Sequence, residues 1–338
     1  MNAKARNASK RDQARCPGFP LDAPCPAETL EAGNLRIIVY EDASDMGLAS
    51  ALSIASEQCR LAEKKGAVSL MLMAAPSAEP FYGAYISLVE SSIRLREAVR
   101  KTHFFQFDDY RLPLHSAASF RYLLCRRFFF PIAEYYDADK VHLFQSDARD
   151  IDQACRQYGK LIMEHGPDLQ LKGTGENGHW GFHEPGIPLD TPPRFQRVKL
   201  SEENVAQQMR DHPRLFRTPD AVPTEAFTAN VALFMRTREL IEDNVPQASK
   251  AFALLASHGS SKVDAAAPSS ALKKHRRGIV RATLASAWAL LEYRRKGVVS
   301  ASMLARMASA TAPGGAARSE QVQASMRKVL EQMRIECE

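Results

Sequence analysis

Residues 173–185 read Gly-Thr-Gly-Glu-Asn-Gly-His-Trp-Gly-Phe-His-Glu-Pro, and the interpretation of the whole chain starts from this segment. It follows a short strand-like run at 168–171, and four of its first nine residues are glycine. Glycines at this density after a strand let the backbone turn sharply and approach a ligand closely. His179 and Glu184 stand five residues apart in the segment, and both side chains can transfer protons near neutral pH. The segment therefore predicts a ligand-binding loop with acid–base chemistry; the alternative is a tight surface turn with solvated side chains.

The rest of the chain alternates between strand and helix patterns. Apolar runs predict strands at 35–40, 68–73, 103–107 and 140–144, and helical spacing predicts helices at 46–65, 119–130, 150–164 and 201–210. Strands that alternate with helices at this spacing predict a parallel sheet covered by helices on both faces. We therefore expect an α/β fold with its site at the carboxyl ends of the strands.

The loop after the strand at 68–73 carries a candidate anion site. Ala75, Pro76 and Ser77 lie between that buried strand and a helix expected from residue 81. Such a loop is where an open α/β sheet tends to bind anions. The hydroxyl of Ser77 suits either a phosphate or a helix cap, and the sequence leaves both roles open.

Asp108 and Asp109 follow the strand at 103–107. Adjacent carboxylates at that point are either a catalytic base with its neighbour or a turn and cap pair, and the turn is slightly favoured. Lys250 opens a later helix, as an anion ligand or as a surface charge. Before it, the run 239–245 sits where another strand is due, although it is unusually acidic for a strand buried on both faces.

Three parts of the chain are expected to differ in character. Residues 1–32 contain four prolines and predict an irregular N-terminal arm. Residues 33–282 form the α/β domain, in which the apolar run 227–235 packs on the sheet. The pattern turns helical after Arg277, so residues 283–338 are expected to be a helical C-terminal extension. Its last apolar stripe is either a packing face or the contact of a homo-oligomer.

The composition excludes several classes of protein. The 338 residues carry a net charge of +6, with 45% apolar and 25% charged residues, which is ordinary for a globular protein. No apolar run approaches the roughly 18 residues of a membrane helix, and the basic N-terminus lacks the apolar core of a secretory signal. The basic clusters are not interleaved with aromatic residues, so we expect no nucleic-acid partner. The six cysteines show no paired spacing, which favours free thiols in the cytoplasm.

In their order and intervals, these motifs resemble those of the glucosamine-6-phosphate deaminase/isomerase family, within the 6-phosphogluconolactonase superfamily. The matching stretches are 106–110, 112–121, 150–158, 173–185, 222–226 and 249–251. The resemblance implies a modified Rossmann-type parallel sheet with the site at the strand carboxyl ends. It implies an enzyme that opens an amino-sugar phosphate ring, moves a proton between C2 and C1 and releases ammonia, giving fructose 6-phosphate. It implies no cofactor and no metal, and a small sugar phosphate as the partner.

The resemblance also assigns roles to individual residues. Asp108 is implied as the base that moves the C2/C1 proton, and His179 as the ring-opening acid and base, oriented by Glu184 and Asn177. The implied substrate- and phosphate-binding residues are Ala75, Pro76, Ser77, Gly173, Gly175, Gly178 and Lys250. The family commonly has Thr-Gly-Gly-Thr-Pro where this chain has residues 76–80, so Glu79 brings a negative charge close to the expected phosphate.

Three other functions agree with parts of the sequence. A 6-phosphogluconolactonase shares the fold and a similar loop, although the Asp-Asp-Tyr stretch and the Phe-His-Glu-Pro ending favour a deaminase. A non-catalytic sugar-phosphate sensor would keep the pocket without the chemistry. A metal site on His179, His183 and Glu184 has the spacing of helical zinc ligands, but Gly181 and Pro185 disfavour the helix that this spacing needs.

Overall fold

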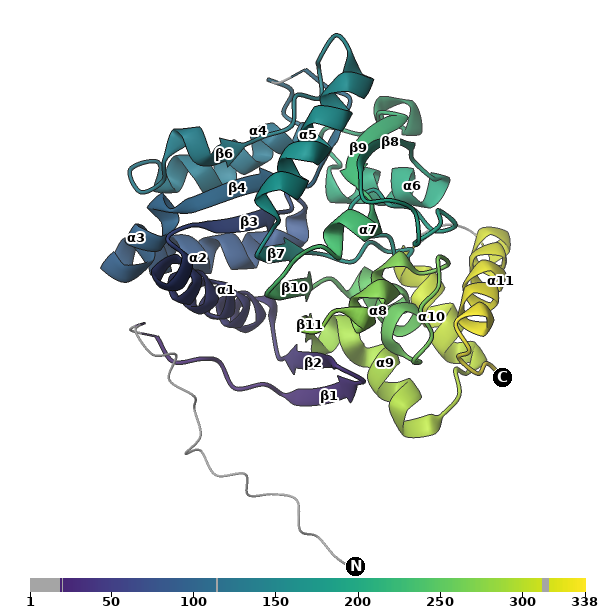
Figure 1. Ribbon diagram of the computed structural model, residues 1–338. Coiled ribbons are helices and arrows are strands. Elements are labelled where there is room, and N and C mark those ends of the chain that lie inside the picture. Colours follow the sequence, from purple (N-terminus) through teal and green to yellow (C-terminus); the bar gives the residue numbers. More distant parts are fainter. Residues whose placement is uncertain (1–18, 20, 114, 312–315) are drawn as a thin grey trace, which may run out of the picture.

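The computed structural model describes residues 19, 21–113, 115–311 and 316–338, and its centre is an eight-stranded sheet (Figure 1). In spatial order the strands are β1 (Glu28–Ala32), β2 (Leu35–Tyr40), β11 (Gly278–Thr283), β10 (Leu240–Val245), β7 (Leu169–Lys172), β3 (Val68–Leu72), β4 (Thr102–Gln106) and β6 (Val141–His142). Neighbouring strands pair in parallel, except that β1 runs antiparallel to β2. The predicted α/β fold with a parallel sheet is confirmed.

Helices form a layer on each face of this sheet. They are α1 (Ala43–Lys65), α2 (Glu79–Ser91), α3 (Ile93–Arg100), α4 (Phe120–Leu124), α5 (Ile151–His165), α6 (Glu202–Asp211), α7 (Val231–Phe234), α8 (Ala251–His258), α9 (Leu284–Lys296), α10 (Ala301–Thr311) and α11 (Ala316–Gln332). α1, α2 and α3 contact one another, and α8 contacts α9. Crossovers between parallel strands are right-handed, so connections that run toward β6 and connections that run back toward β2 put their helices on opposite faces.

A smaller antiparallel sheet stands at the carboxyl end of β4. Its order is β5 (Asp108–Tyr110), β9 (Glu225–Ala229) and β8 (Phe195–Lys199). A single residue, Phe107, separates β5 from β4. The smaller sheet therefore holds Asp108 and Asp109 beside the edge of the large sheet at which the parallel strands end.

The connection from β2 to β3 shows how local sequence sets these elements. The side chain of Asp42 accepts hydrogen bonds from the backbone N–H groups of Ser44 and Asp45, which caps the first turn of α1. Gly66 ends the helix with φ of 77°, a conformation that glycine adopts without steric cost. β3 then follows as a mainly apolar run, interrupted by Ser69, that is buried along its whole length.

The acidic strand β10 lies in the middle of the sheet, and all six of its residues are buried. Two cations from neighbouring strands make this burial tolerable, because buried charges are stable only when paired. Arg281 of β11 donates two hydrogen bonds to Glu242, at 2.7 and 3.1 Å. Lys172 of β7 lies 2.6 Å from Asp243. The expectation of a strand at 239–245 is confirmed.

Four details differ from the expectations. Residues 28–32 form β1 rather than irregular chain, because they pair with β2 at the sheet edge; residues 1–18 and 20 of that arm lie outside the described residues. Residues 278–283 form β11, a buried strand, where a helical pattern was expected to begin. α4 stops at residue 124 and continues as π- and 3₁₀-helical turns to 132. β6 has only two residues.

The C-terminal helices pack close to the sheet and to one another. α9 contacts β11, β2 and α8, while α10 contacts α11 (Figure 1). The boundary at residue 282 stays a prediction. Within the described residues, none of the helices combines the length and the apolar character that crossing a membrane requires.

Candidate active site

Loops at the carboxyl ends of four parallel strands and the helix α6 line one pocket. Its lining residues are Met73, Ala75, Pro76, Ser77, Phe107, Asp108, Phe120, Gly173, Thr174, Gly175, His179, Gly181, Phe182, Gln207, Gln208, Asp211 and Lys250. Eight of the predicted site residues are in this set, whereas Asn177, Gly178 and Glu184 are not. With its open mouth the depression has about 430 Å³ of empty space.

The glycine loop folds back on itself to place the imidazole of His179 against its own backbone. The N–H of Gly175 donates to the carbonyl of His179 at 3.0 Å, and Thr174 and Trp180 form a β-bridge. A Cβ atom on residue 175 would overlap the ring of His179, so only glycine fits there. Gly178 has φ of +89°, which the turn between these residues requires. The density of glycines in the sequence thus reflects close packing around one side chain.

Asp108 and Asp109 have different surroundings although they are adjacent. Asp108 lines the pocket, is 5% exposed, and its Oδ1 has no hydrogen-bond partner among the described residues. Burial, with the charge of Asp109 added, raises the pKa of Asp108 well above its usual range. Asp109 instead accepts hydrogen bonds from the backbone N–H groups of Phe120 and Arg121 and from the hydroxyl of Ser119. The carboxyl of Asp108 therefore faces the pocket, and the carboxyl of Asp109 holds the N-terminus of α4.

His179 is a neutral imidazole in this pocket. Burial lowers its pKa to about 3, and the nearby ammonium groups of Lys250 and Lys172 act in the same direction. Its Nδ1 has no hydrogen-bond partner in the described part of the chain. A buried imidazole that is neutral at pH 7 has one nitrogen that can accept a proton and one that can donate.

Glu184 lies beside Asn177 and not against the ring of His179. It accepts hydrogen bonds from Asn177, Ser201 and Asn204, and burial raises its pKa despite these contacts. Asn177 in turn accepts from the backbone N–H of His179 at 3.1 Å. Among the described residues no hydrogen bond joins Glu184 to the imidazole, so this carboxyl supports the loop backbone that carries His179.

The expected phosphate end of the pocket contains Ser77 and Lys250. Both are buried, at 3% and 4% exposure, and both line the pocket. Neither the turn at Pro76–Ala78 nor α2 has a side-chain cap, so Ser77 is not a helix cap. Glu79 points to Arg127, at 2.6 Å, and does not line the pocket. The negative charge of Glu79 is therefore directed away from an anionic ligand.

His183 does not join His179 in a metal site. Its Nδ1 accepts from the backbone N–H of Val231 at 3.3 Å, so its Nε2 donates to the carbonyl of Ile187 at 3.2 Å. Burial lowers the pKa of His183 to about 4, which agrees with a neutral ring. Both nitrogens are thus occupied by backbone groups.

Two features of the pocket were missed in the sequence. α6 contributes Gln207, Gln208 and Asp211, which nothing local marks as ligand-facing. Below the glycine loop, Lys172 lies within hydrogen-bond distance of Thr174, Asp243 and Ser269. The sequence does contain an indication of this second feature. A lysine in a buried strand and an aspartate in the neighbouring strand are stable there only as an ion pair.

The sheet, the loops at its carboxyl edge and this pocket define an α/β protein with one candidate site at the carboxyl ends of its parallel strands. The chain is 31% identical to a glucosamine-6-phosphate deaminase of Shouchella clausii over 194 residues, which are 56% of this chain and 74% of that protein. It is 37% identical to one of Rhodopirellula baltica over 140 residues, 40% of this chain and 52% of that relative. The chain belongs to the glucosamine-6-phosphate deaminase family, as its motifs predicted.

Solved structures agree on the fold. A monomeric glucosamine-6-phosphate deaminase superposes with a TM-score of 0.65 at 22% identity, over 75% of this chain and 98% of that one. The 6-phosphogluconolactonase of Trypanosoma brucei gives 0.57 at 18% identity, over 75% of this chain and 97% of that one. No protein-family model matches the chain. The match to the Rhodopirellula baltica relative spans only about half of that protein's length.

Proposed function

We propose that this protein converts glucosamine 6-phosphate, or a related hexosamine phosphate, to fructose 6-phosphate and ammonia. The observation that carries the proposal is the meeting of Asp108 and His179 in one pocket with Ser77 and Lys250. Membership in the deaminase family supports this reaction over lactone hydrolysis. We also propose a cytoplasmic enzyme of amino-sugar catabolism whose partner is a small sugar phosphate, since the five described cysteines are free.

The neutral imidazole of His179 suits ring opening. In our proposal it takes the proton of the C1 hydroxyl and returns a proton to the ring oxygen, so that the C1–O5 bond breaks and an aldehyde forms. An imidazolium would have no free lone pair for the first of these steps. The low pKa of about 3 keeps the ring in the required state at neutral pH.

Asp108 suits the proton transfer that follows. Its carboxylate removes the C2 proton, and the resulting enolamine takes that proton back at C1, which leaves an iminium at C2. Water adds to this iminium and ammonia leaves, giving the ketone. A raised pKa makes the carboxylate a stronger base, and the ammonium group of the substrate would stabilise its charged form.

The phosphate group is proposed to lie between Lys250, the hydroxyl of Ser77 and the backbone of residues 75–77. An ammonium, a hydroxyl and backbone N–H groups are the usual donors to a phosphate.

The test is a coupled assay that follows ammonia and fructose 6-phosphate from glucosamine 6-phosphate. Asp108→Asn keeps the shape of the side chain and removes the base, so kcat is expected to fall by about 100-fold or more. Asp190→Asn, a change at an exposed loop carboxylate, is the matched control and should leave kcat unchanged. Undiminished turnover in the Asp108 variant would exclude that residue as the base. A wild type that releases no ammonia from any hexosamine phosphate would exclude the proposed reaction.

A further inference from the structure

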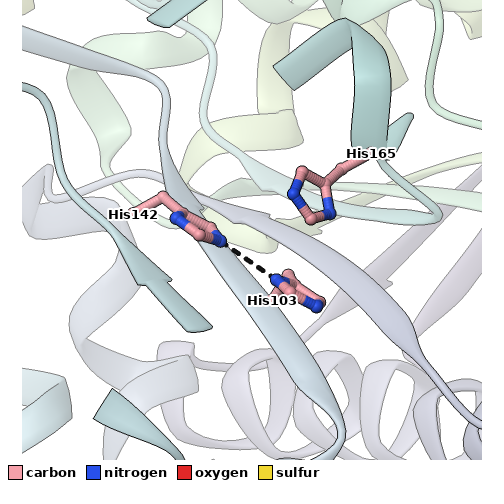
Figure 2. A group of neighbouring side chains, drawn as sticks. All are labelled: His103, His142 and His165. Atoms are coloured by element: carbon pink, nitrogen blue, oxygen red, sulfur yellow. Dashed lines mark hydrogen bonds between the residues drawn. The ribbon is translucent and has the colours of Figure 1, made fainter. Parts of the chain in front are cut away.

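Three histidines come together on the large sheet, away from the pocket. Figure 2 shows His103 of β4, His142 of β6 and His165, the last residue of α5, with their rings side by side. The ring centroids of His103 and His165 are 4.3 Å apart. The ring centroid of His142 lies 5.3 Å from each of them. One ring nitrogen from each residue lies within 4.8 Å of the other two.

The geometry of the cluster is held in place by its surroundings. The buried ring of Phe105 packs against His142 and His165, with centroid distances of 4.7 and 5.4 Å. The hydroxyl of Tyr158 donates to the carbonyl of His142, and Arg238 donates to the carbonyl of His165. The backbone positions of two of the three imidazoles are thus fixed before any ligand arrives, which reduces the entropy lost on binding.

Each of the three rings contributes one nitrogen to the cluster. Nδ1 of His103 and Nε2 of His142 are 3.0 Å apart and share one proton. A cation bound between these two nitrogens would replace their hydrogen bond. The proton of that bond would first move to the other nitrogen of the imidazole that carries it.

We propose that His103, His142 and His165 form a binding site for a divalent transition metal, with Zn²⁺ as the best match. Three imidazoles without a carboxylate or thiolate favour zinc, nickel or copper over magnesium or calcium. The fourth position is left for water or an anion. Asp137 and Lys140 form an ion pair at 2.8 Å, and both charges act on His103 with opposite signs, so neither strongly favours nor opposes a cation there.

Such a metal would stabilise the fold and take no part in the reaction. His103 precedes the pocket residue Phe107 by four strand residues, about 13 Å at the rise of a β-strand. The site would join β6, an edge strand of two residues, to β4 and to the end of α5. Its occupancy would therefore raise the resistance of this edge to unfolding while leaving turnover unchanged.

The test uses the full chain without a histidine tag, stripped with chelator and titrated with Zn²⁺. We expect about one zinc per chain, X-ray absorption that shows three imidazole nitrogens, and a melting temperature a few degrees higher. His165→Gln removes one ligand at a helix end and leaves both strands intact, so affinity should fall by about 100-fold or more. His115→Gln, an exposed histidine outside the cluster, is the matched control and should bind zinc like the wild type.

Three outcomes would overturn the proposal. The first is zinc affinity that is equal in the wild type and the folded His165→Gln protein. The second is an absorption spectrum with fewer than three imidazoles. The third is a melting temperature that is the same with and without Zn²⁺ at pH 7.5.

Discussion

Asp108 and Asp109 show how one bond along the chain separates two roles. Successive side chains of a strand point to opposite sides, so β5 presents one carboxyl to the pocket and the other to the N-terminus of α4. In the sequence the pair was interpreted slightly in favour of a turn and cap. That interpretation holds for Asp109, which accepts the backbone N–H groups of α4, and not for Asp108, which lines the pocket.

Gly175 is the residue at which the sequence motif can be tested most directly. In Gly175→Ala the new methyl group would overlap the imidazole of His179, which has to turn or shift. A displacement of about 1 Å of a catalytic group can cost 100-fold in rate, so we expect kcat/KM to fall by about that factor. The measurement is the ammonia assay, together with thermal unfolding.

Gly83→Ala is the control for this change. Residue 83 lies in α2, and a Cβ atom there has nothing within 4 Å. Alanine is the better helix former, so stability should rise by up to about 1 kcal/mol with activity unchanged. Wild-type activity in Gly175→Ala would mean that the imidazole does not need its position against residue 175.

At this scale the sequence identified the groups that carry charge and the positions that need glycine. It did not identify which partner each group has. Glu184 was expected to orient the imidazole of His179, but its hydrogen bonds go to Asn177, Ser201 and Asn204. Such contacts depend on where α6 packs, and a polar helix on the surface carries no local sign of its neighbour.

Among the elements, β10 and β7 depend on each other through a buried ion pair. Lys172 and Asp243 are fully buried and lie 2.6 Å apart below the glycine loop. Lys172→Met leaves the Asp243 carboxylate without its cation, which typically costs 3–5 kcal/mol. We expect urea unfolding to show a loss of about that size. Adding Asp243→Leu should recover part of it, because no buried charge then remains.

An ion pair on the surface serves as the control for the substitution of Lys172. Lys160 and Glu164 stand one turn apart on α5, and both are more than half exposed. Lys160→Met should change stability by less than about 1 kcal/mol, since solvent screens such pairs. Equal effects of the two lysine substitutions would show that Lys172 contributes nothing specific to the junction of β7 and β10.

The elements that were predicted well are those with a strong apolar rhythm. α1, β3 and α5 appear close to their expected bounds, because one face or both faces of each are buried. β11 was missed because Arg281 interrupts its apolar run, and the partners of that buried arginine, Glu242 of β10 and Tyr40 of β2, lie on the neighbouring strands. β1 was missed because an exposed edge strand has few apolar residues. In both cases the decisive partner is distant in sequence.

On the scale of the whole molecule, buried ionisable groups make stability depend on pH in opposite directions. Burial lowers the pKa of His179 to about 3, below the value of an unfolded histidine. As pH falls below about 6.5, the unfolded chain binds a proton that the folded chain does not, so stability is lost. Burial raises the pKa of Asp108, so the protonated carboxyl stabilises the folded protein at low pH. This stabilisation is lost as pH rises through the raised pKa.

Single substitutions separate these two contributions. We expect the wild type to lose roughly 2 kcal/mol more than His179→Gln between pH 6.5 and pH 5, at 1.36 kcal/mol per unit for one proton. Relative to Asp108→Asn, the wild type should instead become less stable as pH rises above about 3.9, the ordinary pKa of an aspartate. Urea unfolding in the presence of chelator measures both differences. Parallel pH curves for the wild type and His179→Gln would mean that the pKa of this imidazole is the same in the folded and the unfolded chain, so burial would not be what keeps it neutral as the initial proton acceptor in ring opening.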